Sequence, residues 1–277
     1  LSLLVLLVFF SSGPGSSAVA ADTIKIGGTG FALETMRILA GVYRQSHPEV
    51  EVVVFPSLGS SGGIKALMAG DLGIALSSRP LQEKEKGLPL QELAFFKTPF
   101  VFVVHPQVEK TSISTEELEK IYGEKTLSWP DGSRLRLVLR PKKETDTDIV
   151  MGLSPSMKVA VSNAMGRKGM ILKITDQENL DALENIPGAL GATTLNQLLS
   201  EQRQLNVLTL NGLTPSVGML REGSYPLSKT LFLVTGLDTS PAARQFLDYI
   251  ASDQAEKILS MYGNLRLTGN GQSEHAK

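Results

Sequence analysis

Up to residue 80, the chain repeats one pattern: an apolar strand-like segment, a polar loop of small residues, and a segment with helical spacing. The strand-like segments span residues 24–26, 50–55 and 72–76, and helical spacing is found in residues 33–43 and 63–68. Repetition of strand, turn and helix is typical of an α/β fold with a mainly parallel sheet. In such a sheet, ligands bind beyond the carboxyl ends of the strands. The pattern therefore predicts an α/β fold whose ligand crevice lies at one edge of the sheet.

A polar loop follows each of these strands, in residues 27–30, 59–63 and 77–79. The second loop, Gly59-Ser60-Ser61-Gly62-Gly63, leads directly into a helical pattern. The first N–H groups of a helix lack partners within the helix and carry the positive end of its dipole, so they favour an anion. The alternative is that Ser60 serves only as the N-cap of this helix. Because three such loops converge on one sheet edge, we expect an anion-binding site there.

The rest of the chain alternates further strands and helices. Strands are expected at residues 98–106, 135–139, 206–210 and 230–235. Helices are expected from the N-cap Ser114 to near Gly123, and then at residues 149–153 and 241–262.

The loop Arg140-Pro141-Lys142-Lys143-Glu144-Thr145-Asp146-Thr147 joins the strand 135–139 to the helix that follows. Arg140 is the candidate anion ligand in this loop, and the alternative is a surface position after the strand. Lys142 and Lys143 are interpreted as part of a solvated face.

Composition excludes several classes of partner. Of 277 residues, 27 are Lys or Arg and 28 are Asp or Glu, which gives a formal net charge of -1. This balance provides no overall field for nucleic acid or an anionic membrane, so we expect no nucleic-acid partner. The chain has no Cys, and its three His residues, His47, His105 and His275, are dispersed. We therefore expect no disulfide, no metal site and no cofactor.

The chain begins with an apolar segment, residues 1–10, followed by Ser, Gly and Pro and then by Ala18-Val19-Ala20-Ala21. This order is typical of a secretory signal peptide, and the apolar segment is too short for a membrane span. We expect a signal peptide over residues 1–20 and a periplasmic mature protein that begins near Ala21. An uncleaved N-terminal anchor is the alternative. Residues 268–277 are polar, and we expect a disordered tail there.

Five segments together resemble a known family. They are, in order, Gly59-Ser60-Ser61-Gly62-Gly63-Ile64-Lys65-Ala66-Leu67, Ala75-Leu76-Ser77-Ser78-Arg79-Pro80, Phe100-Val101-Phe102-Val103-Val104-His105-Pro106, Ile186-Pro187-Gly188-Ala189-Leu190-Gly191 and Gly223-Ser224-Tyr225-Pro226-Leu227. Their order and spacing resemble the PstS-like phosphate-binding proteins of bacterial ABC importers. The resemblance covers nearly the whole mature chain, roughly residues 22 to 267.

The resemblance implies a type 2 periplasmic binding protein fold: α/β, with two lobes, two mixed, mainly parallel sheets and a two-strand hinge. Lobe one would comprise residues 22–100 and 225–267, and lobe two would comprise residues 101–224. The hinge strands would lie near residues 100–104 and 225–233.

The resemblance also implies an extracytoplasmic solute-binding protein that captures phosphate or a phosphate-like oxyanion. Its partner would be the membrane permease of an ABC importer, and a monomer is expected. A protein that senses the oxyanion for a sensor kinase is the alternative, because both functions need the same closing cleft.

The loops and the resemblance together assign the ligand-binding residues. These are Thr29, Gly30, Phe31, Ser60, Ser61, Gly62, Ser78, Arg79, Arg140, Glu144, Thr145 and Asp146. For Arg79, the alternative is that it only lies on an exposed turn before Pro80.

Two positions depart from the family pattern. Ser78 stands where several family members place a carboxylate, and Glu144 falls where a Ser donor is expected, unless the loop shifts and Thr145 takes that role. A carboxylate accepts a hydrogen bond from a protonated oxyanion such as phosphate and repels sulfate, which carries no proton. Glu144 and Asp146 are the alternative acceptors. The identity of the oxyanion therefore depends on residues 144–146.

A serine hydrolase is an alternative from another class of function. It would need a base near Ser60 or Ser61, and His105 is the plausible candidate. The segment 59–63 lacks the spacing of the G-x-S-x-G motif of hydrolases. We therefore expect no catalytic residues.

Overall fold

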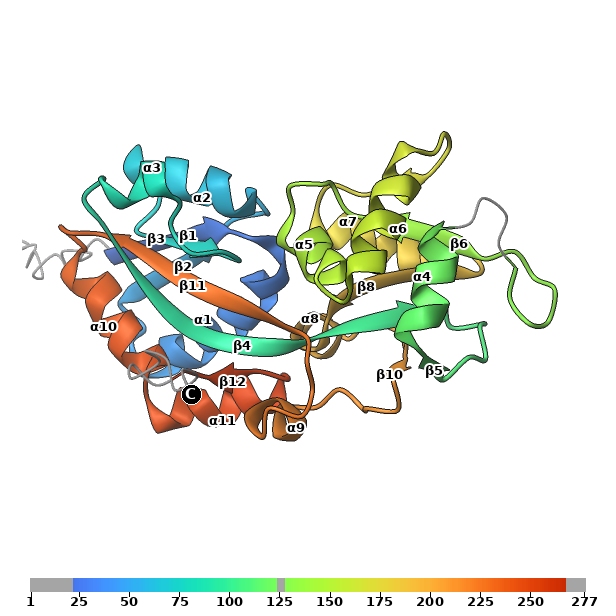
Figure 1. The fold of residues 1–277 in the computed structure, drawn as a ribbon. Coiled ribbons are helices and arrows are strands. Elements are labelled where there is room, and N and C mark those ends of the chain that lie inside the picture. The colour runs from blue at the N-terminus through green and yellow to red at the C-terminus, as the bar shows by residue number, and fades with distance from the viewer. Residues whose placement is uncertain (1–21, 124–127, 268–277) are drawn as a thin grey trace, which may run out of the picture.

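The computed structural model describes residues 22–123 and 128–267, so the expected signal peptide and tail lie outside the described residues. The described chain forms two α/β halves that are connected by long strands (Figure 1). Within residues 22–123 and 128–267, no helix has the length and apolar character needed to cross a membrane.

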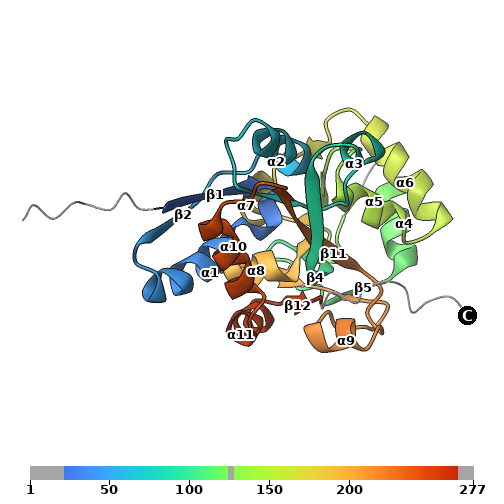
Figure 2. The same ribbon diagram turned by 90° about the vertical axis from the view of Figure 1, so that its left-hand side faces the viewer.

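The first half contains both ends of the described chain. Its own elements are β1 (Asp22–Gly28), η1 (Gly30–Ala32), α1 (Leu33–Ser46), β2 (Val50–Val54), α2 (Gly59–Met68), β3 (Ile74–Ser77), α3 (Glu83–Lys86), α10 (Pro241–Ile250), α11 (Asp253–Met261) and β12 (Leu265–Arg266). Strand β1 lies between β2 and β3 and pairs in parallel with both. Helices α1, α10 and α11 pack on one face of the sheet and α2 packs on the other (Figure 1 and Figure 2).

The apolar spacing of α1 explains how it packs. Leu33, Met36, Leu39, Ala40 and Tyr43 recur every three or four residues, which places them on one side of a helix. All five are buried in the core that this helix forms with the strands. Full burial of a large apolar side chain contributes about 1.5 to 3 kcal/mol, so this face supplies much of the stability of the first half.

The second half is built from the middle of the chain. Its elements are β5 (Ser112–Ile113), α4 (Thr115–Gly123), β6 (Arg136–Leu139), α5 (Thr145–Met151), α6 (Pro155–Gly166), β7 (Ile171–Leu172), α7 (Asp176–Asn185), β8 (Ala189–Thr194), α8 (Leu195–Ser200), β9 (Asn206–Val207), β10 (Thr209–Leu210) and α9 (Val217–Arg221). Strand β6 pairs in parallel with β7 and β8. Helices α4, α5 and α6 pack on one face, and α7 and α8 pack on the other.

Two antiparallel strands connect the halves. The first part of β4 (Leu90–Val104) pairs with β11 (Ser228–Gly236), and its last part, from Phe100 onward, pairs with β8. The strands therefore follow the order β2-β1-β3-β11-β4-β8-β6-β7 across both halves. The strand predicted at residues 98–106 begins earlier, at Leu90, because residues 90–99 pair with β11. The prediction missed residues 90–94, which are exposed or partly buried.

The Gly/Ser run differs from its prediction. Helix α2 begins at Gly59 rather than at Gly63, so this run forms the first turn of the helix instead of a loop before it. Gly59 has a φ of 66°, a left-handed conformation that favours glycine.

Two other predicted elements are divided. The helix expected at residues 241–262 is two helices, because the Ser252 hydroxyl accepts the N–H of Ala255 and caps α11 after α10 has ended. The strand expected at residues 206–210 is β9 and β10, which pair with β4 and β5 respectively. Helices α6, α7 and α8 were not predicted.

Helix α2 approaches β1 so closely that their backbones touch. A Cβ added at Gly63 would lie 2.7 Å from the Cα of Gly28. Gly28 has a φ of 140°, and a Cβ there would lie 2.0 Å from the carbonyl oxygen of Leu76. Both contacts therefore require glycine. They hold the start of α2 beside the ends of β1 and β3, where the polar loops meet.

Gly63→Ala is expected to destabilise the protein by about 1 to 3 kcal/mol, because α2 must move away from β1. Gly41→Ala is the matched control: this glycine lies within α1, and an added Cβ would meet nothing within 4 Å. The control should stabilise the protein by about 0.5 to 1 kcal/mol. Denaturant unfolding measures both changes. An unchanged stability for Gly63→Ala would contradict the backbone contact.

Candidate functional site

The second and third polar loops contact each other at the carboxyl end of β3. The N–H of Ser78 donates to Oγ of Ser60 at 2.9 Å, and the two Oγ atoms lie 3.1 Å apart. The first loop joins them, because the N–H of Thr29 donates to the carbonyl of Leu76 at 2.9 Å. Ser60 thus links two loops and is not the N-cap of α2, a position that Leu58 occupies.

Arg79 and Ser61 are engaged within the first half. The Arg79 guanidinium makes hydrogen bonds of 2.7 and 2.9 Å to the carboxylate of Glu85 and a third of 3.0 Å to Oγ of Ser61. The hydrogen bonds from Arg79 lower the pKa of Glu85 despite the opposing effect of burial, so the pair is ionised at neutral pH. Glu85 was missed by the sequence analysis. Its position three residues after Gln82, with which it forms a capping box, is the pattern that could have indicated it.

A hydroxyl contact crosses from the first half to the second. Oγ of Ser78 lies 3.0 Å from Oγ1 of Thr145, which also donates to the carbonyl of Ser78 at 3.4 Å. Thr145 is the first residue of α5, and Glu144 precedes it as the N-cap. Two residues, Glu144 and Thr145, were left by the sequence analysis for the position of the expected Ser donor. In the structure Thr145 contacts the first half, while the Glu144 side chain is 41% exposed.

Glu144 lies at the rim of a charged cluster. Partial burial raises its pKa, the nearby Arg140 opposes this, and the carboxylates of Asp176 and Asp146 raise it further. The net effect is a raised pKa. Glu144 therefore ionises less readily than an exposed Glu.

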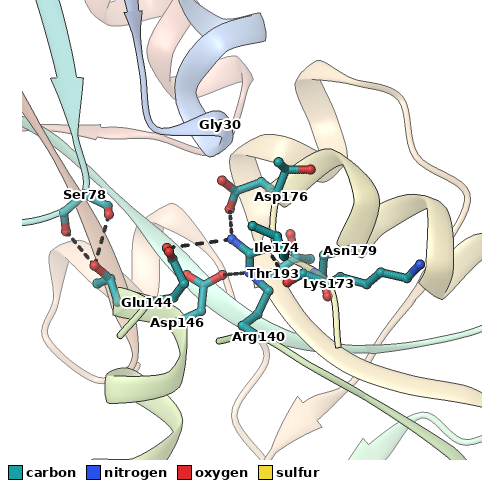
Figure 3. A network of polar contacts seen from close by, with 12 residues as sticks. Gly30, Ser78, Arg140, Glu144, Asp146, Lys173, Ile174, Asp176, Asn179 and Thr193 are labelled. Atoms are coloured by element: carbon teal, nitrogen blue, oxygen red, sulfur yellow. Dashed lines mark hydrogen bonds and ion pairs between the residues drawn. The ribbon is translucent and has the colours of Figure 1, made fainter. Parts of the chain in front are cut away.

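Arg140 directly follows β6 and is buried, so the alternative of a surface position is wrong. Its Nε donates to Oδ2 of Asp146 at 3.3 Å, and its Nη1 donates to the carbonyl of Lys173 at 2.9 Å. Its Nη2 lies 3.6 Å from Oδ1 of Asp176 (Figure 3). The guanidinium is thus held by contacts on three sides.

Lys229, on β11, is a second buried cation that the sequence analysis missed. Its Nζ donates to Oδ1 of Asp146 and lies 3.4 Å from Oδ1 of Asp176. The same nitrogen lies 4.7 Å from the centre of the Phe31 ring. The available signal was the alternation of the strand, which puts Lys229 on the same side as the buried Leu231.

Asp176, the first residue of α7, was also missed, and it contacts the first half. A Cβ added at Gly30 would lie 2.6 Å from Oδ2 of Asp176 and 2.7 Å from Oε1 of Gln177. Nε2 of Gln177 in turn donates to the carbonyl of Gly30 at 3.1 Å. In Figure 3, the Asp176 carboxylate lies between Gly30 and the Arg140 guanidinium.

The buried cluster contains two basic side chains, Arg140 and Lys229, and two acidic ones, Asp146 and Asp176. Burial alone would raise the pKa of Asp176, but the charges of Lys229 and Arg140 outweigh burial and lower it. Burial alone would lower the pKa of Lys229, but the carboxylates of Asp146 and Asp176 outweigh burial and raise it. Asp176 and Lys229 are therefore ionised together at neutral pH.

The remaining expected residues surround this cluster. Thr29 and Phe31 are buried, and the carbonyl of Phe31 accepts a hydrogen bond of 3.1 Å from Nδ2 of Asn196, on α8. Gly62 lies in the first turn of α2, where an added Cβ would lie 3.1 Å from the Cβ of Leu58. Of these residues, Phe31 contacts the second half through its carbonyl, whereas Thr29 and Gly62 contact residues of the first half.

Lys229→Met is expected to destabilise the protein at neutral pH by about 3 to 5 kcal/mol, because it leaves two buried carboxylates with one cation. Lys25→Met, at an exposed position on β1, is the control and should change stability by less than about 0.5 kcal/mol. Urea unfolding at pH 7 measures both.

The cost of Lys229→Met should shrink in acid. A lowered pKa stabilises the folded state above the unfolded value of 3.8, and this contribution is lost as the pH falls through the folded pKa of Asp176. The gap between parent and variant should therefore narrow below pH 3.8. An equal gap at pH 3 and pH 7 would contradict the charge pairing.

Two curated relatives have similar sequences. Phosphate-binding protein PstS of Borreliella burgdorferi is 23% identical over 222 residues, which cover 77% of this chain and 79% of the relative. The protein of the same name from Bacillus subtilis is 23% identical over 247 residues, which cover 87% of this chain and 79% of the relative.

A solved structure has the same fold. It is that of a Clostridium perfringens protein with bound phosphate, described as a phosphate ABC transporter substrate-binding protein. It aligns with a TM-score of 0.73 at 17% identity and covers 89% of this chain and 100% of that chain. The alignment confirms the predicted two-lobed α/β fold.

A match to a protein-family model identifies the family of this chain. A family model described as a PBP superfamily domain matches residues 14–254, which is well over half of the chain. The chain therefore belongs to the PBP superfamily.

Proposed function

We propose that the chain is an extracytoplasmic solute-binding protein that captures phosphate or a phosphate-like oxyanion for the permease of an ABC importer. The observation that carries this proposal is the buried guanidinium of Arg140 at the junction of the halves. The names of both curated relatives support phosphate as the ligand. The apolar segment 1–10, which lies outside the described residues, supports export.

The junction offers enough donors for useful affinity. Arg140 and Lys229 are cations, and Gly30 contributes a backbone N–H. The hydroxyls of Ser78 and Thr145 meet across the halves. Micromolar binding needs about 8 kcal/mol, and a charge-assisted hydrogen bond contributes about 1.5 to 3 kcal/mol. About four to six such bonds therefore suffice before costs are subtracted.

Acceptors at the junction favour a protonated oxyanion. Ser78 offers a hydroxyl where the family resemblance places a carboxylate, but Asp146 brings a carboxylate from the second half. A carboxylate accepts the O–H of phosphate and repels the fully ionised sulfate. We therefore infer selectivity for phosphate over sulfate.

We infer a binding role without catalysis. His105, the base that a serine hydrolase would need, is buried at the end of β4, where its Nδ1 accepts the N–H of Gln107 at 3.2 Å. Ser60 and Ser61 lie on α2 in the other half and have Ser78 and Arg79 as partners. The serines and the histidine therefore lie in different halves and have other hydrogen-bond partners.

Arg140→Ala is expected to weaken phosphate binding by about 10- to 100-fold, the equivalent of one or two charge-assisted hydrogen bonds. Lys142→Ala, in the same loop, should change it by less than about twofold. Isothermal titration calorimetry measures both, with circular dichroism to show that each variant is folded. Equal effects would mean that the site is misplaced.

Calorimetry of the parent protein tests the ligand. Phosphate should bind one to one, and sulfate should give no heat at the same concentration. Arsenate, phosphonates and molybdate extend the series. A folded protein that binds none of these anions at neutral pH would refute the proposed function.

A further inference from the structure

The Asp176 carboxylate makes the contacts that a bound oxyanion would make. It lies against the backbone of Gly30 from the first half. It also lies 3.6 Å from Nη2 of Arg140 and 3.4 Å from Nζ of Lys229. A carboxylate and a phosphate share the same chemistry here, since both present anionic oxygens to N–H donors. One side chain of the protein thus engages both of the cations that the proposed function assigns to the ligand.

These contacts also hold the two halves together. Asp176 begins α7 in the second half, whereas Gly30 begins η1 in the first half. The neighbouring Gln177 adds a hydrogen bond of 3.1 Å to the carbonyl of Gly30. Gly30 leaves room for both side chains, because a Cβ there would lie 2.6 Å from Oδ2 of Asp176. The Asp176 side chain is 9% exposed, so it is enclosed between the halves.

Asp146 is held differently from Asp176, which contacts Gly30 of the first half. Both of its carboxylate oxygens are engaged from elements that flank it, by Arg140 after β6 and by Lys229 on β11. Outward movement of Asp176 would therefore release Arg140 and Lys229 from one carboxylate while Asp146 still pairs with both.

We propose that Asp176 is an internal competitor that occupies the anion position in the free protein and is displaced by the incoming oxyanion, so that it sets the affinity of the site. This inference rests on the proposed function for the identity of the oxyanion. It implies that the free protein closes on its own carboxylate. The observed affinity is then lowered by the fraction of molecules in which the position is already filled.

Asp176→Asn tests the competition. The amide keeps the size of the side chain and removes its charge, so it competes less well for Arg140 and Lys229. Calorimetry should show phosphate binding that is tighter by about tenfold or more, the equivalent of losing one charge-assisted hydrogen bond. Asp181→Asn is the matched control on the same helix, where the side chain is 60% exposed and pairs with Arg203. It should leave the affinity within twofold. Weaker or unchanged phosphate binding by Asp176→Asn would overturn the inference.

Small-angle X-ray scattering without any anion tests the closure separately. The parent and Asp181→Asn should be compact, and Asp176→Asn should have a larger radius of gyration. Gly30→Ala provides a second route to the same state, because its methyl group pushes Asp176 away from the other half. Equal dimensions for the parent, Asp176→Asn and Gly30→Ala would overturn the inference. If neither the parent nor Asp176→Asn binds phosphate, the proposed function is wrong, and the scattering comparison still decides whether Asp176 closes the protein.

Discussion

The arrangement of the two halves depends on a buried cluster of four charges: Arg140, Asp146, Asp176 and Lys229. Removing an ion from water costs several kcal/mol, and an attraction to a well-placed partner must offset this cost. The four residues come from the end of β6, the start of α5, the start of α7 and the strand β11. Each of these elements is therefore constrained by the others, because moving one of them leaves a buried charge without its partner.

The connecting strands couple this cluster to the junction of the halves. Lys229 lies on β11, which pairs with β4 along the part of β4 that belongs to the first half. Its partners Asp146 and Asp176 belong to helices of the second half. A charge on a connecting strand thus contacts helices of the opposite half. Under the proposed function, an anion that enters the cluster would therefore influence closure.

The departures from the family pattern have a physical consequence under the proposed function. The end of β3 carries the hydroxyl of Ser78, which contacts Thr145 across the junction, and the acceptor carboxylate of Asp146 comes from α5. Acceptors that belong to the second half reach a ligand on the first half only when the halves are closed. Selection against a fully ionised anion would then occur at closure rather than at first contact.

Local patterns in the sequence were sufficient to predict the α/β fold, because strand, glycine turn and helix each depend on neighbouring residues. The position of Arg140 directly after a strand made it a candidate ligand, and the family resemblance added Thr145, which begins a helix. Only the tertiary structure brought Asp176 and Lys229 together beside Arg140, and only it showed that Arg79 pairs with Glu85. The reason is separation along the chain: Lys229 lies 83 residues from Asp146 and 53 from Asp176, and no local pattern records a contact over that distance.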